Sequence, residues 1–480
     1  MKKYKISNIK WYLSVSFRKL RNQIRFNNLN KHISEGFVNK DILIKYNKSR
    51  VTGPEPCVCH APLRSLYFDI HGKATACCFN RTYILGQYPY NGISEIINGE
   101  NRTFLQNQLC RQNFMYGCQH CHKLIDAGNF EGVEARLYDN LKNQKNVPSE
   151  IVFELDNTCN LECIMCHGEF SSSIAKKQGL SKIQHPYDDE FISQIKNYIP
   201  YLKVAKFLGG EPFLINIYYK LWDLIIDLNP KCKIILQTNG TIFNEKVKDY
   251  LNRGNFYIGI SVDSLDKRNF EHIRKNAIFE TVMNNIDEFI KVSNKKGNFV
   301  NISVCPMQQN WKEIPDIVKF CNARNVFIYF NTVYTEGFAI SELPEEKLFE
   351  ILTYYKTSKI AAKSYIAKRN SRFFRNFISN VESWYNVKEI ESRFTRKRHL
   401  WNYNKLREAL ILKLNEDESA IKVLDEVIDK SNTEFYLSDE NVQTLDNTKS
   451  EDIINALKTE SKDKIRHRML SFVEKGKFGE

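Results

Sequence analysis

The sequence CNLECIMCHG, residues 159–168, places three cysteines close together in the chain. Cys159, Cys163 and Cys166 have the spacing C-x3-C-x2-C. Immediately before them, IVFELD (151–156) is an apolar run with β-branched and aromatic residues, which is typical of a buried strand. The three thiols are therefore expected in a loop that directly follows a strand.

The residues after this loop repeat an alternation of strand and helix patterns. Helical periodicity is clearest at 218–228 and 279–292. Further strands are predicted at AKFLGG (205–210), KIILQT (233–238), FYIGISVD (256–263), NFVNISVCP (298–306) and VFIYFNTV (326–333). Six strands alternating with helices predict an α/β fold with a parallel sheet and right-handed crossovers. Functional groups of such a sheet lie at the carboxyl ends of its strands.

Three thiolates at such a strand end are suited to one kind of metal site. They can bind three irons of a [4Fe–4S] cluster and leave the fourth iron free for an outside ligand. A catalytic zinc ion is the alternative, but three thiolates this close together, with His167 beside them, would be an unusual zinc site. The chain is large and its thiols are grouped, so we expect them to bind metal and not to form disulfides.

The C-x3-C-x2-C spacing after the first strand of six β/α units resembles the radical S-adenosylmethionine (SAM) superfamily. LGGEP (208–212), after the second strand, resembles the GGE segment of that superfamily. The resemblance implies a partial (β/α)6 TIM-like barrel, SAM bound at the open iron, and reductive cleavage of SAM to a 5'-deoxyadenosyl radical that removes a substrate hydrogen. It also implies a reducing partner such as flavodoxin or ferredoxin. Met165 departs from the pattern, because an aromatic residue usually precedes the third cysteine.

The same resemblance suggests which residues bind SAM. Gly209 and Gly210, with Glu211, would let the backbone approach the ligand and present carbonyls to its ammonium group. Arg274 could pair with the SAM carboxylate. Short polar groups that could reach the ribose or the amino-acid moiety are Thr238, Asn239, Ser261 and Asp263, and expected adenine contacts are Val304, Cys305, Pro306 and Met307. Taken singly, the glycine pair and Thr-Asn-Gly are also ordinary turn sequences. Cys232 and Cys321 are expected to be core thiols.

A second group of cysteines precedes the β/α region. Cys59, Gly72 and Cys77 have the spacing C-x12-G-x4-C, with LYFDI as a predicted strand and HGK as its turn. Cys118 and Cys121 form a C-x2-C pair. These four thiols could close a metal site, and structural zinc is the alternative to an iron–sulfur cluster.

Residues 59–121 resemble the twitch domain, the shortened relative of the SPASM domain, which carries an auxiliary [4Fe–4S] cluster. The order departs from the usual one, since this segment precedes the β/α domain instead of following it. The resemblance implies one auxiliary cluster bound by Cys59, Cys77, Cys118 and Cys121. Possible replacements among the ligands are Cys57, Cys78 and Cys110.

Charge and composition divide the chain into four segments. Residues 1–50 form a basic arm, 51–125 the cysteine-rich segment, 148–335 the radical SAM core, and 336–480 a helical region. The arm holds thirteen Lys/Arg against Glu35 and Asp41, a surplus of eleven in a net charge of +14. Its apolar residues at helical spacing are Leu13, Phe17, Leu20 and Ile24, with Arg18, Lys19, Arg21 and Arg25 around them. Such a helix could lie on an anionic membrane surface, bind an acidic leader peptide or nucleic acid, or dock on its own chain.

The composition also bounds the function. Without an apolar run of 18 residues or a signal-peptide pattern, the chain is expected in the cytoplasm. No RNA-binding signature is present, so we expect no nucleic-acid partner. We expect a radical SAM enzyme that oxidises a peptide or small molecule, by dehydrogenation or crosslinking, with help from the auxiliary cluster. The alternatives are redox-neutral epimerisation or rearrangement, RNA modification, and a non-catalytic protein with structural zinc in residues 51–125.

Overall fold

The computed structural model describes residues 38–50, 52–142, 147–396, 398–428 and 434–475. The helix predicted in the basic arm, with Leu13 and Arg18, lies outside these residues. The contacts divide the chain into two units, of which the first runs to Leu343 and includes Glu350–Val381. The second contains Pro344–Phe349 and Glu382–Glu480. Among the helices within the described ranges, none has both the length and the apolar character needed to cross a membrane.

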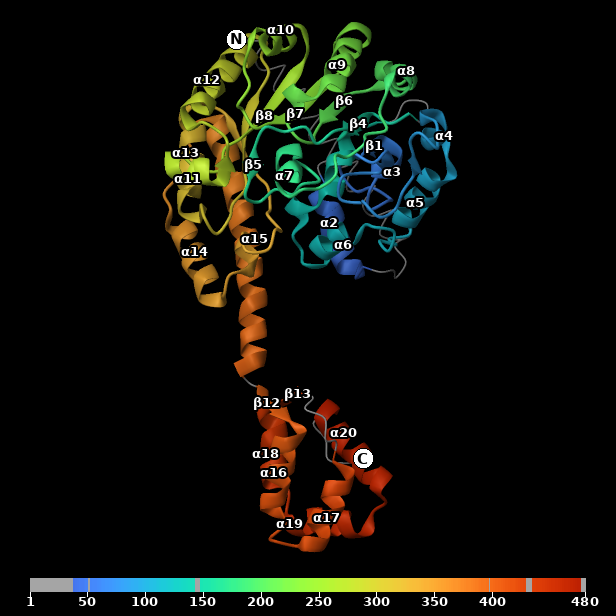
Figure 1. Ribbon diagram of the computed structural model, residues 1–480, viewed down its shortest axis with the longest axis vertical. Helices are drawn as coiled ribbons and strands as arrows, with labels where there is room; N and C mark the ends of the chain where they lie inside the picture. The colour runs from blue at the N-terminus through green and yellow to red at the C-terminus, as the bar shows by residue number, and fades with distance from the viewer. Residues whose placement is uncertain (1–37, 51, 143–146, 397, 429–433, 476–480) are drawn as a thin grey trace, which may run out of the picture. The chain divides into compact units, whose positions relative to one another are not determined.

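A nine-stranded sheet is the centre of the first unit (Figure 1). Six of its strands are parallel and follow one another in chain order: β4 (Glu150–Phe153), β6 (Val204–Phe207), β7 (Lys233–Thr238), β8 (Phe256–Ser261), β10 (Val300–Val304) and β11 (Phe327–Phe330). The helices between them include α8 (Asp189–Lys196), α9 (Asn216–Leu228), α10 (Glu245–Arg253), α12 (Phe279–Lys295) and α13 (Ile314–Ala323). The predicted α/β class and all six predicted strands are confirmed.

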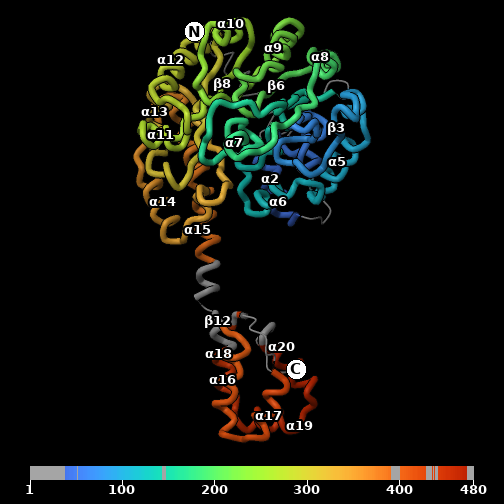
Figure 2. Tube along the Cα trace, in the orientation of Figure 1, coloured from blue at the N-terminus to red at the C-terminus, as the bar shows by residue number. Residues whose placement is uncertain are grey.

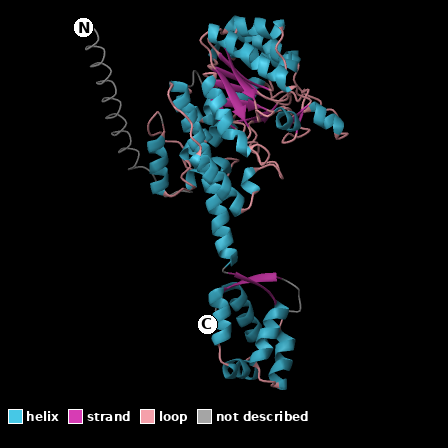
Figure 3. Ribbon diagram, turned by 90° about the vertical axis from the view of Figure 1, so that its left-hand side faces the viewer, coloured by secondary structure: helices cyan, strands magenta, loops and turns pink. Residues whose placement is uncertain are grey.

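The two faces of the parallel strands differ in chemistry, because successive side chains in a strand point to opposite faces. On the helix-covered face, Trp222 of α9 is fully buried, with ring centroids 5.7 Å from Phe207 and 5.5 Å from Phe256. On the other face, Gln237 donates to Ser261 Oγ at 2.8 Å and accepts from Ser303 Oγ at 2.9 Å. The inner face is therefore polar, and helices pack against the apolar face (Figure 3).

The cysteine-rich segment adds three strands to the same sheet. β1 (Ser65–Phe68) pairs in parallel with β4, and β2 (Lys73–Thr75) and β3 (Gly86–Gln87) extend the sheet beyond it. The predicted LYFDI strand and HGK turn are present, with Gly72 in the left-handed region at φ +86°. This segment is therefore continuous with the parallel strands, and Figure 2 shows it in blue beside them. The boundaries expected at 125 and 148 fall inside one structural unit. The reason is that β1, which precedes them, pairs with β4, which follows them.

One helix contacts both β11, at one end of this sheet, and the chain just after the cysteine-rich segment. In α15 (Tyr365–Arg396), Asn370 donates to the carbonyl of Val326 at 2.9 Å and accepts from the Ile328 amide at 3.0 Å, which attaches the helix to β11. Farther along the helix, Asn380 accepts at 2.7 Å from Asn129, which lies just beyond the cysteine-rich segment. The first part of the region predicted as C-terminal therefore belongs to the first unit.

The second unit is mainly helical, as expected, but it also contains a two-stranded antiparallel sheet. Its helices are α16 (Tyr403–Lys413), α17 (Glu418–Val427), α18 (Asp439–Asn447), α19 (Ser450–Thr459) and α20 (Lys462–Lys475). β12 (Arg398–Asn402) and β13 (Glu434–Ser438) pair antiparallel and were not predicted. The unit has its own apolar core, which includes Leu406, Leu414, Leu424 and Phe472.

Candidate functional site

The three cysteines of the opening motif lie in the loop after β4. Cys163 belongs to the short strand β5 (Glu162–Cys163), which pairs antiparallel with β9 (Arg274–Lys275). The amide of Cys166 donates to the carbonyl of Cys163 at 3.0 Å. Burial, with a smaller effect of the neighbouring thiols, raises the pKa of Cys166 to about 12; burial also raises the pKa of Cys163 to about 11, although the charge of Arg274 lowers it. Burial therefore disfavours the thiolate forms in this loop, and a bound metal would stabilise them.

Side chains from other loops hold the cysteine loop in place. Asn160 accepts from Asn239 Nδ2 at 2.9 Å and donates to Thr241 Oγ1 at 3.0 Å, which ties the loop to the end of β7. Thr335, after β11, donates to the carbonyl of Met165 at 2.9 Å. Asn160, Thr241 and Thr335 were missed by the sequence analysis. Only Thr241, next to the Thr-Asn-Gly turn, had a signal in the sequence.

Gly209 and Gly210 bring the end of β6 against the chain that leads to Cys159. Gly209 has φ +92°, and a Cβ on it would lie 2.4 Å from the carbonyl oxygen of Asp156. A Cβ on Gly210 would lie 2.1 Å from the carbonyl oxygen of Thr158. The amide of Glu211 donates to that same oxygen at 2.7 Å. The glycines were predicted to admit a ligand, and in the structure they also admit the chain's own backbone.

Glu211 connects the ends of two neighbouring strands. Its buried carboxylate accepts from the Asn239 amide at 2.7 Å, from Thr238 Oγ1 at 2.8 Å and from the Phe213 amide at 3.2 Å. Burial raises the pKa of Glu211 to about 7, against these hydrogen bonds, which lower it. Glu211 and Thr238, predicted as SAM contacts, are hydrogen-bonded to each other, which joins the ends of β6 and β7.

Arg274 and Asp263 form a buried ion pair beside the cysteine loop. Arg274 Nη2 lies 2.7 Å from Asp263 Oδ2, and the other oxygen of Asp263 accepts from the Cys305 amide at 2.7 Å. Arg274 Nη1 also donates to Cys163 Sγ at 3.9 Å. The sequence analysis expected Asp263 and Arg274 to contact SAM separately, whereas the structure pairs them with each other.

The remaining predicted SAM contacts are divided between two places. Ser261 lies on the polar inner face with Gln237. Met307 belongs to a small apolar cluster against which Met165 and Cys305 pack. Met165 therefore lies against the predicted adenine-contact segment. Cys232 and Cys321 are buried, as expected for core thiols.

The four auxiliary cysteines surround one cavity in the cysteine-rich segment. Cys59, Cys77, Cys118 and Cys121 all line it, together with apolar side chains such as Leu105 and Phe114. Burial raises the pKa of Cys118 to about 11 and that of Cys121 to about 12. The structure thus brings together the four thiols that the sequence analysis grouped, and their soft donors suit either an iron–sulfur cluster or zinc.

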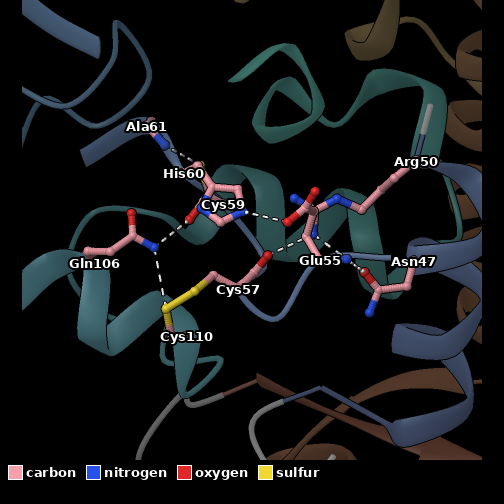
Figure 4. Close-up of a disulfide and its surroundings, with 9 residues drawn as sticks. All are labelled: Asn47, Arg50, Glu55, Cys57, Cys59, His60, Ala61, Gln106 and Cys110. Atoms are coloured by element: carbon pink, nitrogen blue, oxygen red, sulfur yellow. Dashed lines mark hydrogen bonds and ion pairs between the residues drawn. A yellow bond between two sulfur atoms is a disulfide. The ribbon is translucent and has the colours of Figure 1, made fainter. Parts of the chain in front are cut away.

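A disulfide beside this cavity was not expected from the sequence. Cys57 and Cys110 are bonded to each other, and Gln106 Nε2 donates to the carbonyl of Cys59 at 3.0 Å and to Cys110 Sγ at 3.4 Å (Figure 4). The expectation that the thiols form no disulfide is wrong for this pair. The pairing joins residues 53 positions apart, because α5 (Glu100–Cys110) places Cys110 next to Cys57. Neither residue is free to replace an auxiliary ligand in this state.

Cys78 lies on a different side from Cys77. It does not line the cavity. Burial raises the pKa of Cys78, and the charged groups that also shift this pKa are Glu134, Lys206 and Arg81. The pKa of Cys77 is raised by burial, by Cys78, and also by Cys59 and Cys121, which line the cavity with it. Of the adjacent pair, Cys77 is therefore the one directed at the other three thiols.

Within the described residues, no three His, Cys, Asp or Glu side chains are gathered around one point as ligands of a single ion. In a [4Fe–4S] cluster each thiolate binds a different iron, so the sulfurs surround a larger object than one ion. Metal analysis distinguishes a cluster from zinc.

Comparison with known proteins gives a family match over the parallel strands. Residues 154–321 match the Radical SAM superfamily. A probable GTP 3',8-cyclase of Methanocaldococcus jannaschii is 29% identical over 248 residues, which are 50% of this chain and 74% of that protein. The GTP 3',8-cyclase of Aliarcobacter butzleri is 25% identical over 173 residues, 36% of this chain and about half (51%) of that protein. The crystal structure of Streptococcus suis SuiB bound to S-adenosylmethionine aligns with a TM-score of 0.32 and 15% identity, covering 52% of this chain and 60% of that one.

Replacing Gly210 with Ala tests the backbone contact at the end of β6. The new Cβ would lie 2.1 Å from a backbone oxygen that cannot move without displacing Cys159, so we expect a loss of about 1–3 kcal/mol or more in the free energy of unfolding. Denaturant unfolding of the metal-free protein measures this loss. Gly92→Ala is the control, because its Cβ would be no nearer than 3.4 Å to another atom. Equal stability of both variants would contradict the contact.

Proposed function

Residues 154–321 of this chain form a domain of the radical SAM superfamily, and from this premise we propose that the protein cleaves SAM reductively at a [4Fe–4S] cluster bound by Cys159, Cys163 and Cys166. The observation that carries the proposal is the coincidence of the family match with three neighbouring thiols after the first core strand. When bound, the cluster supplies the electron that breaks the sulfonium bond of SAM.

The chain's own residues would bind and orient SAM beside these thiols. Gly209, Gly210 and Glu211 lie against the backbone that leads to Cys159, and Asn239 is tied to the same loop. The polar inner face, with Gln237, Ser261 and Ser303, offers hydrogen bonds to a polar ligand within the curve of the sheet. A ferredoxin or flavodoxin would supply the electron, and we place the protein in the cytoplasm, where the bond between Cys57 and Cys110 would be reduced to two thiols.

We further propose that Cys59, Cys77, Cys118 and Cys121 bind an auxiliary [4Fe–4S] cluster. The proposal is supported by the cavity that all four thiols line and by its apolar walls. A cluster with four protein ligands has no iron free to bind SAM. In this proposal residues 51–125 are a twitch-like segment and residues 148–335 the catalytic core.

The auxiliary cluster would make the overall reaction an oxidation. Removal of a hydrogen atom leaves a substrate carbon radical, which must lose or gain an electron or join another group. Iron–sulfur potentials span about −700 to +450 mV, so a four-thiolate cluster can accept the radical's electron as the substrate releases a proton. The substrate would be a peptide or a small molecule that is dehydrogenated or crosslinked.

The sequence identity with GTP 3',8-cyclases supports a second candidate function, the rearrangement of a nucleotide. The Methanocaldococcus jannaschii relative matches this chain over 74% of its own length. Incubation of the reduced enzyme with SAM and GTP tests this candidate. GTP-dependent formation of 5'-deoxyadenosine would favour it over peptide or alcohol oxidation.

Replacing Cys159, Cys163 and Cys166 together with Ala tests the active cluster. Because these thiolates would be its protein ligands, the variant should lose about four irons per chain and should form no 5'-deoxyadenosine with SAM and dithionite. Iron analysis and chromatography of the reaction measure both. Continued formation of 5'-deoxyadenosine by the variant would show that these cysteines do not bind the active cluster.

The adjacent cysteines 77 and 78 form a matched pair for the auxiliary site. Cys77 lines the cavity and Cys78 does not, so Cys77→Ala should reduce the iron content from about eight to about four per chain, whereas Cys78→Ala should keep about eight. Both variants should still cleave SAM. A content of about four irons and one zinc in the unmodified protein would instead make this segment a structural zinc module.

Turnover in deuterated water distinguishes oxidation from redox-neutral chemistry. If the auxiliary cluster accepts the electron, the product should lack a pair of hydrogens relative to the substrate and should carry no solvent deuterium at the reacting carbon. Mass spectrometry gives both quantities. A product of unchanged composition with deuterium at carbon would contradict net oxidation.

A further inference from the structure

Arg274 is a buried cation in contact with one of the three core thiols. Only 5% of it is exposed, and it is the direct partner of Cys163 in the ladder between β5 and β9. Its Nη1 donates to Cys163 Sγ at 3.9 Å, and its Nη2 lies 2.7 Å from Asp263 Oδ2. The ladder is closed by a further bond at 2.9 Å, from the amide of Ile164 to the carbonyl of Ile273. The guanidinium is therefore held beside the sulfur by backbone pairing as well as by its own contacts.

Asp263 fixes the direction of this guanidinium. It is fully buried after β8, and its second oxygen is occupied by the amide of Cys305 at 2.7 Å. A carboxylate held in this way can accept from Arg274 on one side only, which leaves Nη1 to face Cys163. An arginine keeps its positive charge in a protein, so the contact with sulfur carries a permanent charge.

A positive charge and a hydrogen bond at a ligating sulfur have a defined effect on a cluster. One-electron reduction adds a negative charge to the cluster, and a nearby cation and a donor to sulfur stabilise that charge, which raises the reduction potential. Burial strengthens the effect, since water cannot screen it. Asp263 offsets part of this charge, but it pairs with Nη2, whereas Nη1 is the atom that contacts Cys163.

We propose that Arg274, oriented by Asp263, is a positioning residue that raises the reduction potential of the cluster bound by Cys159, Cys163 and Cys166. This inference rests on the proposed function, because it assumes a cluster at these thiols. It replaces the expectation from the sequence that Arg274 binds the carboxylate of SAM.

The test compares full-length, anaerobically reconstituted variants by redox titration followed by EPR. The SAM-induced change in the EPR signal identifies the cluster under study. Arg274→Met removes the charge at similar length and should lower the reduced fraction at a fixed solution potential at least tenfold, which corresponds to about 59 mV for one electron. Arg274→Lys keeps the charge and should restore most of the reduced fraction. Arg268→Met, on the exposed side of α11 (Lys267–Ile273), is the matched control and should change nothing.

Asp263→Asn supplies a result of opposite sign. Removing its negative charge while keeping an amide oxygen toward Arg274 should raise the potential and increase the reduced fraction. This variant also decides the outcome if Arg274→Met fails to bind iron: a raised potential supports the proposal, and an unchanged one overturns it. If the pair only stabilised the fold, both variants would lose iron. The reduction potential would then not fall in Arg274→Met and rise in Asp263→Asn.

Two further outcomes separate this inference from others. If Arg274→Met retains full iron and an unchanged potential but binds SAM at least tenfold more weakly, Arg274 binds the SAM carboxylate and the proposal is overturned. If the unmodified protein gives no SAM-responsive EPR signal after reconstitution, the proposed function itself fails, independently of Arg274.

Discussion

The parallel pairing of β4 with strands on both of its sides is the constraint on which the rest of the first unit depends. β4 pairs with β6 on one edge and with β1 on the other, so the catalytic strands and the cysteine-rich segment share one hydrogen-bonded sheet. The loop after β4 carries Cys159, and the hairpin after β1 leads to Cys77. The positions of the core cysteine loop and of Cys77 therefore depend on the register of one short strand.

The carboxyl edge of this sheet is held together by buried polar groups that bond to one another. Glu211 joins β6 to β7, Asn239 joins β7 to the cysteine loop, and Asp263 joins the end of β8 to Arg274 and Cys305. Buried polar groups cost free energy unless they are bonded, so each of these side chains restricts its neighbours to one arrangement.

The parallel core could be predicted from the sequence because its signals are local. Runs such as KIILQT and FYIGISVD have strand composition, and they coincide with β7 and β8. The pairing of β1 with β4 could not be predicted, because Ser65 and Glu150 are 85 residues apart and nothing in either run specifies the other. The same holds for the bond between Cys57 and Cys110 and for the attachment of α15 through Asn370. For the site, the residue types were predicted, but the sequence did not reveal that Arg274 and Asp263 would meet, since a pattern of charges does not give side-chain directions.

The attachment of α15 to β11 and to Asn129 has a consequence for the order in which the protein folds. Asn129 and Asn380, which form one of these contacts, are 251 residues apart, and the chain between them includes all six core strands. Contacts between residues so distant in sequence slow folding, because the intervening chain must be ordered first. During synthesis, the cysteine-rich segment leaves the ribosome long before its helical partner exists. Until α15 has been made, this segment lacks that contact and is held by its local contacts, by β4 and by the region of α8, where Asp188 accepts from Tyr88 at 2.6 Å.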